Sequence, residues 1–424
     1  MAARRKRRIV SASSRIERDS LGELAVPSSA LYGIQTLRSL ANLSFSRRTL
    51  GAVPEYVRAL AQVKKAAALA NRDAGVVGTS IAAAIARACD SLIGGDHLDQ
   101  FPVDPLSGGG SIAINMNINE VIANLANETL GGQRGAYDRV NPKTHVNASQ
   151  STADACQTAA RIAIVSQWPR LRAALDACIA AMRAKEREFR RVITVARTCL
   201  QDASPVALGT LFGGYAAAIA RRASEIDRAV DALHRINLGG TAIGSGESAP
   251  LGYRRVIVKR LCEVTGLRLA RKANLFDAAQ NIDELGALAA ALGLLAEVLL
   301  KVAQDLRLLS SGPEGGFGEI RLPAVQEGSS FFAGKINPVI PETLMQCCFQ
   351  VLACERAARL ALQHGELNLN VFEGVAAANI LDAIAMLERS LATFTEKCVR
   401  GIEANEARCR DLAKRSRFRS SYST

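Results

Sequence analysis

The chain has 424 residues, of which 49% are hydrophobic but only 4% aromatic, and it carries a formal net charge of +13. This length allows a large core and more than one domain, and abundant alanine and leucine favour packed helices over core strands. Basic clusters lie at residues 4–8 and 414–419. Because aromatic residues do not alternate with the basic ones there, we interpret them as solvated tails and do not expect a nucleic-acid partner. The remaining positive charge favours an anionic substrate.

The cysteines and the apolar segments bear on the compartment of the protein. Ten cysteines occur without a CxxC pair, and Cys347 and Cys348 are adjacent. This spacing suits neither a metal site nor a disulfide framework and indicates reduced thiols in a cytoplasmic protein. No apolar signal segment follows the basic N-terminus. Glu297 and Lys301 interrupt the apolar run at 285–303, which favours a core helix over a membrane span.

The first third of the chain is expected to form an N-terminal domain at residues 15–146, preceded by a disordered basic arm at residues 1–14. The domain should contain short helices and loops. A helical pattern starts near residue 114 and is expected to end at Gly131 and Gly132, which are typical helix stop signals.

Long helical patterns dominate a central domain predicted at residues 147–402, and residues 403–424 are expected to be the remnant of a small C-terminal domain. Ser151 and Thr152 lie near the start of the first long helix. The predicted helices cover approximately residues 154–190, 205–235, 283–310, 340–364 and 370–402. Because several exceed the average helix length of about 11–12 residues, the sequence predicts a helical bundle.

Two glycine-rich stretches resemble nucleotide-binding loops in composition, but their context argues against a nucleotide site. SGGGS at 107–111 lacks the Lys-Ser/Thr of a phosphate-binding loop. LGGTAIGSG at 238–246 is not surrounded by alternating strands and helices. Neither stretch predicts a bound nucleotide.

A series of sequence motifs resembles the aspartase/fumarase superfamily, and its aspartate ammonia-lyase branch in particular. The similarity covers about residues 15–410 in the expected order. The matching motifs are RIERDSLGELAVPSSALYGIQTLR, INMNINEVIANLA, NPKTHVNASQST, RTCLQDASP, LGGTAIGSG, LPAVQEGSSFFAGKINPVIPE, LNLNVFEGV and TEKCVRGIEANEARCR. The loop GSSFFAGKINP is similar to the family's signature GSSxMPxKxNP.

The resemblance implies an all-α fold with a smaller N-terminal helical domain, a long central bundle and a truncated C-terminal domain. It also implies a homotetramer in which three subunits contribute to each active site. Members of the family remove a proton from one carbon and a leaving group from its neighbour, and they release an unsaturated acid. No metal and no organic cofactor is expected.

By the same resemblance, Ser329 is the catalytic base and acts as an alkoxide. A serine hydroxyl needs surrounding N–H groups and positive charge for this role, which Gly328, Ser330 and the lysine end of the loop are expected to supply. Removal of the proton gives a dianionic intermediate, which catalysis must stabilise. The residues implied at the site besides Ser329 are catalytic Lys335 and substrate-binding Ser151, Thr152, Thr198, Cys199, Ser330 and Asn337.

Several positions depart from the family pattern where aspartases contact the amino group or the adjoining carboxylate of the substrate. They are Ile112, Ala113, Ala153 and Cys199, all small or apolar. An apolar wall leaves a buried ammonium without partners, which costs several kcal/mol. Lys143 and Thr144 stand in place of Asn-Asp, and Asn368 in place of a glutamate. These changes favour a strongly anionic substrate without an amino group.

Phe331 and Phe332 replace Ile-Met in the signature loop, and Ala333 replaces a proline. One interpretation is a more apolar lid over a substrate of different shape. The other is simple repacking of a mobile loop.

Three functions are open at this point. The prediction is a β-eliminating lyase acting on a small anionic acid, for which phosphosulfolactate, converted to sulfoacrylate with loss of phosphate in coenzyme M biosynthesis, is the best fit. The alternative is an aspartate ammonia-lyase, which converts L-aspartate to fumarate and ammonia. A non-catalytic homologue is the third, and the joint presence of Ser329, Lys335 and Asn337 argues against it.

Overall fold

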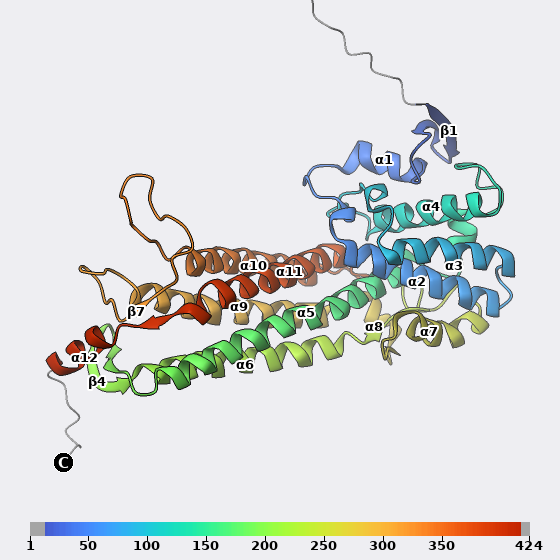
Figure 1. Cartoon of the computed structure of the whole chain (residues 1–424). Coiled ribbons are helices and arrows are strands. Elements are labelled where there is room, and N and C mark those ends of the chain that lie inside the picture. The colour runs from blue at the N-terminus through green and yellow to red at the C-terminus, as the bar shows by residue number, and fades with distance from the viewer. Residues whose placement is uncertain (1–12, 417–424) are drawn as a thin grey trace, which may run out of the picture. The chain divides into compact units, whose positions relative to one another are not determined.

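The structure, a computed structural model, describes residues 13–416 and consists mainly of α-helices (Figure 1). The predicted all-α class is therefore confirmed. Apart from residues 13 and 14, the predicted disordered arm lies outside the described residues. So do residues 417–424 of the predicted C-terminal remnant.

The described chain divides into two compact units, neither continuous in sequence. Unit 1 comprises the residues up to Ile164 together with Leu233–Ile282 and Ala361–Ala378, and unit 2 comprises the rest. The domain boundaries expected after residues 146 and 402 stay predictions.

Unit 1 has a hairpin, two short paired strands and a group of helices. Its strands are β1 (Ser14–Asp19), β2 (Gly22–Pro27), β5 (Arg235–Ile236) and β6 (Ala270–Arg271). Its helices are α1 (Ile34–Leu43), α2 (Pro54–Asp73), α3 (Thr79–Gly94), α4 (Ile112–Thr129), α7 (Leu251–Thr265) and α8 (Leu275–Gln280). Single turns are η1 (Leu50–Ala52), η2 (Leu98–Gln100) and η3 (Pro142–Val146). α2 packs against α3 and α7, and α4 packs against α1 and α3. The region expected to hold short helices and loops thus contains longer helices and a β-hairpin.

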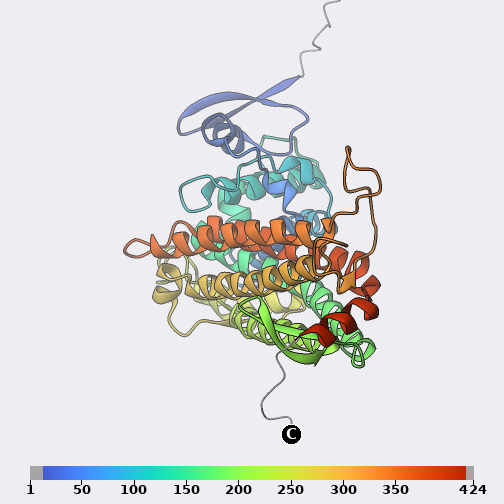
Figure 2. The same ribbon diagram turned by 90° about the vertical axis from the view of Figure 1, so that its left-hand side faces the viewer.

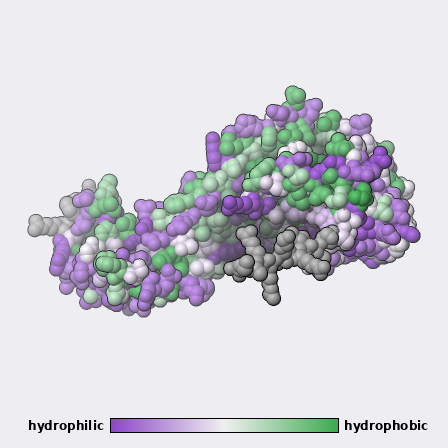
Figure 3. Space-filling view, turned by 90° about the horizontal axis from the view of Figure 1, so that it is seen from above, coloured by the Kyte–Doolittle hydropathy of each residue, from purple (hydrophilic) through white to green (hydrophobic). Residues whose placement is uncertain are grey.

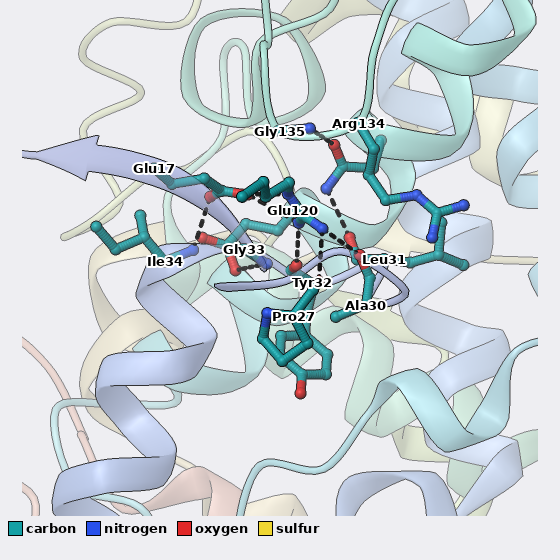
Figure 4. A network of polar contacts seen from close by, with 12 residues as sticks. Glu17, Pro27, Ala30, Leu31, Tyr32, Gly33, Ile34, Glu120, Arg134 and Gly135 are labelled. Carbon is teal, nitrogen blue, oxygen red and sulfur yellow. Dashed lines mark hydrogen bonds and ion pairs between the residues drawn. The ribbon is translucent and has the colours of Figure 1, made fainter. Parts of the chain in front are cut away.

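A buried carboxylate caps the start of α1. Glu120 on α4 is 1% exposed and accepts hydrogen bonds from the backbone N–H groups of Gly33 and Gln35 at 2.9 and 2.8 Å (Figure 4). These belong to the N–H groups at a helix N-terminus that lack intrahelical partners. Glu17 of β1 accepts from the N–H of Ile34 at 2.9 Å in the same way. The two carboxylates tie the hairpin, α1 and α4 together.

Unit 2 is built around long helices that lie side by side in Figure 1. They are α6 (Leu208–Ala232), α9 (Asp283–Leu309), and most of α5 (Thr152–Glu188), α10 (Val339–Gln363) and α11 (Glu373–Lys397). The smaller elements are β3 (Ile193–Thr198), β4 (Gln201–Ala207), β7 (Ile320–Arg321), β8 (Glu403–Ala404), η4 (Val399–Gly401) and α12 (Glu406–Arg415). The five predicted long helices are confirmed within a few residues at most of their ends.

Polar contacts link the long helices of unit 2. Tyr215 on α6 donates to Asp305 on α9 at 2.7 Å, and Trp168 on α5 donates to Asp227 on α6 at 3.0 Å. α9 and α10 also run next to each other in Figure 2. A Cβ added at Gly293 on α9 would lie 3.0 Å from the side chain of Glu355 on α10. The bundle is therefore closely packed along its length.

Helix α9 is long and apolar enough to cross a membrane by length and composition alone. Its leucines recur at helical spacing, and 61% of its most apolar 18-residue window is buried inside the protein. Asp283 and Glu284 lie in its first turn and Arg307 in its last, which complements the helix dipole. These features are those of a core helix, as the sequence predicts.

Candidate active site

The signature loop holds Ser329 in a turn that polarises its hydroxyl. The Ser329 Oγ accepts hydrogen bonds from the backbone N–H groups of Phe331 at 3.0 Å and Phe332 at 2.8 Å. Two N–H donors directed at one oxygen stabilise negative charge on it. Gly328 does not supply one of these donors as expected, because its N–H donates to the Lys335 carbonyl at 2.8 Å.

The rest of the loop closes on itself. Asn337 donates its side-chain N–H to the carbonyl of Gly328 at 2.6 Å, which fixes the two ends of the loop together. The Lys335 Nζ lies 5.9 Å from the centre of the Phe332 ring. Phe331 and Phe332 form an edge-to-face pair and are 85% and 60% exposed. In this conformation the two rings are exposed to solvent, so their use as a lid over the substrate stays a prediction.

Thr198 and Cys199 lie at the tip of a β-hairpin that the sequence did not predict. Strands β3 and β4 pair up to Thr198 and Gln201, so Cys199 and Leu200 alone form the turn. Both have positive φ angles, 53° and 60°, which is the pattern of a type I′ turn. Such angles are costly for residues other than glycine and are found preferentially at functional positions. Cys199 is an exposed free thiol.

A buried ion pair holds this hairpin beside its turn. Arg197 donates to Glu319 at 2.6 Å, and the carboxylate of Glu319 has no exposed surface. The Arg197 guanidinium also stacks on the Phe317 ring, 4.3 Å from its centre. Thr194 donates a further hydrogen bond to Glu319. These contacts hold the hairpin that carries Thr198 in a defined orientation.

Ser151 and Thr152 lie at the start of α5, as the sequence predicts. Asp154, one turn further on and without exposed surface, accepts from the backbone N–H groups of Ser151 at 2.9 Å and of Gly239 and Thr241 at 3.0 Å each. Burial raises the pKa of Asp154 to about 6, while these hydrogen bonds oppose the rise. The carboxylate joins the helix start to the LGGTAIGSG segment. That segment therefore helps to shape the surroundings of Ser151 and Thr152.

Ser151 lines a pocket of about 750 Å³ in unit 1 that also contains Lys143 and Thr144. Both are exposed residues of the π-helical turn η3, where the family pattern has Asn-Asp. Glu247 contributes the one acidic side chain in the lining, and the remaining lining residues carry no charge. The pocket thus places one cation and one carboxylate among hydroxyl and amide groups, and Lys143 is its charged donor for an anion.

Three of the four positions expected to form an apolar wall lie in unit 1, whereas the fourth, Cys199, lies in unit 2. Ala113 on α4 and Ala153 on α5 are each 6% exposed, whereas Ile112 is 44% exposed. None of the three side chains can hydrogen-bond to an ammonium.

The predicted site residues are divided between the two units, and unit 2 does not bring its own members together. Ser151 and Thr152 belong to unit 1, and the remaining ones belong to unit 2. Within unit 2, no hydrogen bond among residues 13–416 joins the Ser329 loop to the Thr198 turn. Both Figures 1 and 2 show the two segments apart.

No pattern in the sequence indicates the cluster of buried polar residues that contacts Thr152. Lys64 on α2 has no exposed surface and donates to Asn115 at 2.7 Å and Asn147 at 2.9 Å. Burial lowers the pKa of Lys64 to about 8. In the sequence, Lys64 is one of two adjacent lysines in a helical pattern, and only its position on the buried face distinguishes it from Lys65.

Among the described residues there is no group of three or more His, Cys, Asp or Glu side chains arranged to hold a metal ion. The ten cysteines are free thiols, and six of them are buried. Burial raises the pKa of these buried thiols, for example to about 12 for Cys348.

Comparison with known proteins identifies relatives over most of the chain. A family model described as Lyase matches residues 22–353. An aspartate ammonia-lyase from Helicobacter pylori is 44% identical over 397 residues, which cover 94% of this chain and 85% of the relative.

The comparison with solved structures also identifies lyases that match most of the chain. A fumarate lyase:delta crystallin from Brucella melitensis, crystallised with cobalt bound, has a TM-score of 0.93 and 44% identity, covering 95% of this chain and 88% of its own. A class II fumarase from Schistosoma mansoni has a TM-score of 0.91 and 31% identity, covering 94% and 87%.

Proposed function

The chain belongs to the aspartase/fumarase superfamily of lyases, and from this premise we propose that it eliminates a leaving group from a small, strongly anionic acid without an amino group. Phosphosulfolactate, which loses phosphate to give sulfoacrylate, is the substrate that fits best. In this proposal the enzyme is cytoplasmic and serves coenzyme M biosynthesis.

The proposed base is Ser329. Its oxygen accepts two backbone N–H hydrogen bonds, which supports ionisation of the hydroxyl. The alkoxide takes a proton from the carbon next to the sulfonate. The electrons of that C–H bond form the new C=C bond, and phosphate leaves from the neighbouring carbon with the C–O bonding pair. Lys335 and Asn337 stabilise the negative charge that accumulates before phosphate leaves.

The substrate class depends mainly on one observation, that Lys143 lines the same pocket as Ser151. A lysine ammonium attracts a phosphate or sulfonate and has no comparable partner on an uncharged leaving group. Ala113 and Ala153 support the absence of an amino group in the substrate, because their side chains offer no acceptor to an ammonium.

The proposed assembly is a homotetramer in which three subunits complete each site. Its support is the separation of Ser329 from Thr198 in one chain. Exposed apolar side chains on the bundle helices give further support, since Leu294, Phe349 and Leu360 are 43%, 52% and 39% exposed. Hydrophobic residues also reach the surface in the face drawn in Figure 3. Where such residues form a contiguous patch, they mark a surface that contacts another protein.

Aspartate ammonia-lyase is the second candidate, because relatives with this name are 44% identical over most of the chain. Under this alternative the small residues at 112, 113, 153 and 199 are tolerated variation. A non-catalytic homologue would retain the fold without any turnover.

The test is a mass-spectrometric assay of the purified full-length chain with phosphosulfolactate, L-aspartate and malate. We expect sulfoacrylate and phosphate from the first, no fumarate from aspartate, and no turnover by Ser329→Ala. The matched control is Ser224→Ala, which removes an exposed hydroxyl that bonds only within α6. Fumarate and ammonia from aspartate would overturn the substrate assignment. Full activity of Ser329→Ala would overturn the base.

Lys143→Met then tests the substrate class. We expect its kcat/KM for the phosphorylated substrate to fall by about 10-fold or more, the value of one charge-assisted hydrogen bond. Lys259→Met, on α7, is the control. An unchanged kcat/KM in Lys143→Met would remove the main support for the anionic leaving group.

A further inference from the structure

The Thr152 hydroxyl is held by neighbours that determine what it can bind. Its Oγ1 accepts a hydrogen bond from the side-chain N–H of Asn115 on α4, at 2.8 Å. A threonine hydroxyl has a single proton to donate. Since its oxygen already receives a donor, that proton is free to point at an acceptor. Thr152 is half-buried at the first residue of α5, where the helix dipole also favours a negative ligand.

The orientation of the Asn115 amide is in turn set by Lys64. An amide side chain has one acceptor oxygen and one NH₂ group with two donors. The Lys64 Nζ donates to the Asn115 oxygen at 2.7 Å, and an ammonium can only donate. The amide nitrogen must therefore point away from Lys64, and its two N–H groups reach Thr152 at 2.8 Å and the oxygen of Asn147 at 3.1 Å.

Asn147 fixes the same arrangement from the other side. Its side-chain oxygen also accepts from Lys64 at 2.9 Å, and its own N–H donates to the Gln150 carbonyl at 3.1 Å. Both partners of the buried ammonium are thus neutral amides. A fully buried ammonium is costly to keep without a paired carboxylate, so its presence beside the proposed site calls for a reason.

We propose that Lys64 and Asn115 are positioning residues: Lys64 orients the Asn115 amide so that Thr152 acts only as a hydrogen-bond donor towards the acidic group of the substrate. This inference rests on the proposed place of Thr152 at the substrate, but it does not depend on which group leaves. It holds equally for phosphosulfolactate and for aspartate.

Asn115→Asp separates this role from general support of the fold. The carboxylate has the same shape and still accepts from Lys64, now as an ion pair. It cannot donate to Thr152, so the Thr152 hydroxyl turns its proton towards Asp and away from the substrate. Thr152→Val removes the hydroxyl at nearly constant volume and isolates the effect of that group.

Calorimetric titration of the full-length chain with succinate measures this effect without turnover. Succinate is a dicarboxylate without a leaving group, so its binding is independent of the proposed reaction. We expect Asn115→Asp and Thr152→Val each to weaken succinate binding by about 10- to 100-fold, as for a hydrogen bond to a charged group. The double variant should bind no more weakly than the weaker single variant.

The double variant distinguishes orientation from simple charge repulsion, because repulsion by a new carboxylate would persist without the Thr152 hydroxyl. Lys65→Met is the control, since Lys65 pairs with Asp90 on the outside of α2 and α3. Equal binding by Asn115→Asp and the unsubstituted chain would overturn the proposal. Additive losses in the double variant, or no succinate binding by the unsubstituted chain, would also overturn it. Loss of phosphosulfolactate turnover alone would affect only the proposed function.

Discussion

The hydroxyl oxygen of Ser329 accepts a hydrogen bond from the backbone N–H of Phe332 at a distance of 2.8 Å. The donor is a backbone group, so the identity of the phenylalanine side chain does not matter for this contact. The contact requires that the backbone of the loop keeps its turn, and two hydrogen bonds hold this turn in place. Gly328 donates to the carbonyl of Lys335, and Asn337 donates back to the carbonyl of Gly328.

Gly328→Ala is therefore expected to impair catalysis while leaving the fold intact. A Cβ at this position would lie 2.5 Å from the backbone nitrogen of Asn337 and 2.6 Å from the Lys335 oxygen, so the loop must open. Displacing the proposed base by about 1 Å reduces turnover by about 100-fold. Steady-state kinetics and thermal unfolding measure the two effects separately.

The control for this variant is Gly315→Ala, where an added Cβ meets nothing within 4 Å. We expect no change in its turnover. If Gly328→Ala retains full activity, the observed loop conformation is not the one in which the enzyme works.

The buried Arg197–Glu319 pair beside the turn of the β3–β4 hairpin predicts a loss of stability in Glu319→Gln. The amide keeps the size of the carboxylate but leaves the mostly buried Arg197 without its counter-ion. Breaking a buried pair from one side costs about 3 kcal/mol or more. Urea unfolding monitored by circular dichroism gives the free energy of unfolding.

Glu396→Gln is the matched variant on the surface. Its partner Arg400 lies one helical turn away, and both side chains are more than half exposed. Such pairs contribute at most about 0.5 kcal/mol. Similar losses in the two variants would mean that the Arg197–Glu319 pair contributes no more than a solvated one.

The sequence predicted the long helices well and the connections between them poorly. The apolar spacing in α9 continues over 27 residues, so its helix was evident. By contrast, the sequence predicts no strand between the helices expected at 154–190 and 205–235, where strands β3 and β4 form the hairpin that carries Thr198. Its turn consists of Cys199 and Leu200 and lacks the Asn or Gly that usually indicates such a hairpin in a sequence.

The candidate site was predicted in the same uneven way. Ser151 and Thr152 could be placed at a helix start from the polar residues before it. The N–H groups that reach Ser329 could not be identified, because they depend on how the backbone turns after Gly328. Lys64 was missed because a lysine beside another lysine in a helix is usually solvated, and only the packing of α2 against its neighbours buries it.

The pKa of Lys64 predicts a pH-dependent stability. Burial lowers this pKa from 10.5 to about 8 in the folded chain, while the unfolded chain retains the usual value. Between these pH values the unfolded chain binds more protons, so raising the pH across this window stabilises the folded state through Lys64. The full effect is about 3 kcal/mol.

Urea unfolding at pH 7.5 and 10.5 measures this contribution of Lys64 to the free energy of unfolding. The comparison is with Lys64→Met, which lacks the titrating group. The stability of the unsubstituted chain should rise relative to that of Lys64→Met as the pH increases. Asp154, Cys156 and Cys89 act on Lys64 electrostatically, but they are present in both proteins. Lys65→Met should follow the unsubstituted chain. Parallel profiles for Lys64→Met and the unsubstituted chain would show that Lys64 keeps an ordinary pKa.

The proposed sharing of sites between subunits predicts complementation between two inactive variants. Ser329→Ala removes the proposed base, and Thr198→Val removes a proposed anion-binding hydroxyl at nearly constant volume. The two residues lie apart in one chain. In a shared site they come from different subunits, so a mixed assembly contains some sites with both native residues.

Each variant alone should therefore be inactive or strongly impaired, and unfolding and refolding them together should restore part of the activity. For two equal populations in which one subunit supplies Ser329 and another supplies Thr198, random assembly restores about a quarter of the sites. Each variant refolded alone is the control, and sedimentation establishes the size of the assembly. Recovery no greater than the sum of the separate activities, in a verified mixed assembly, would place both residues of each site in one chain.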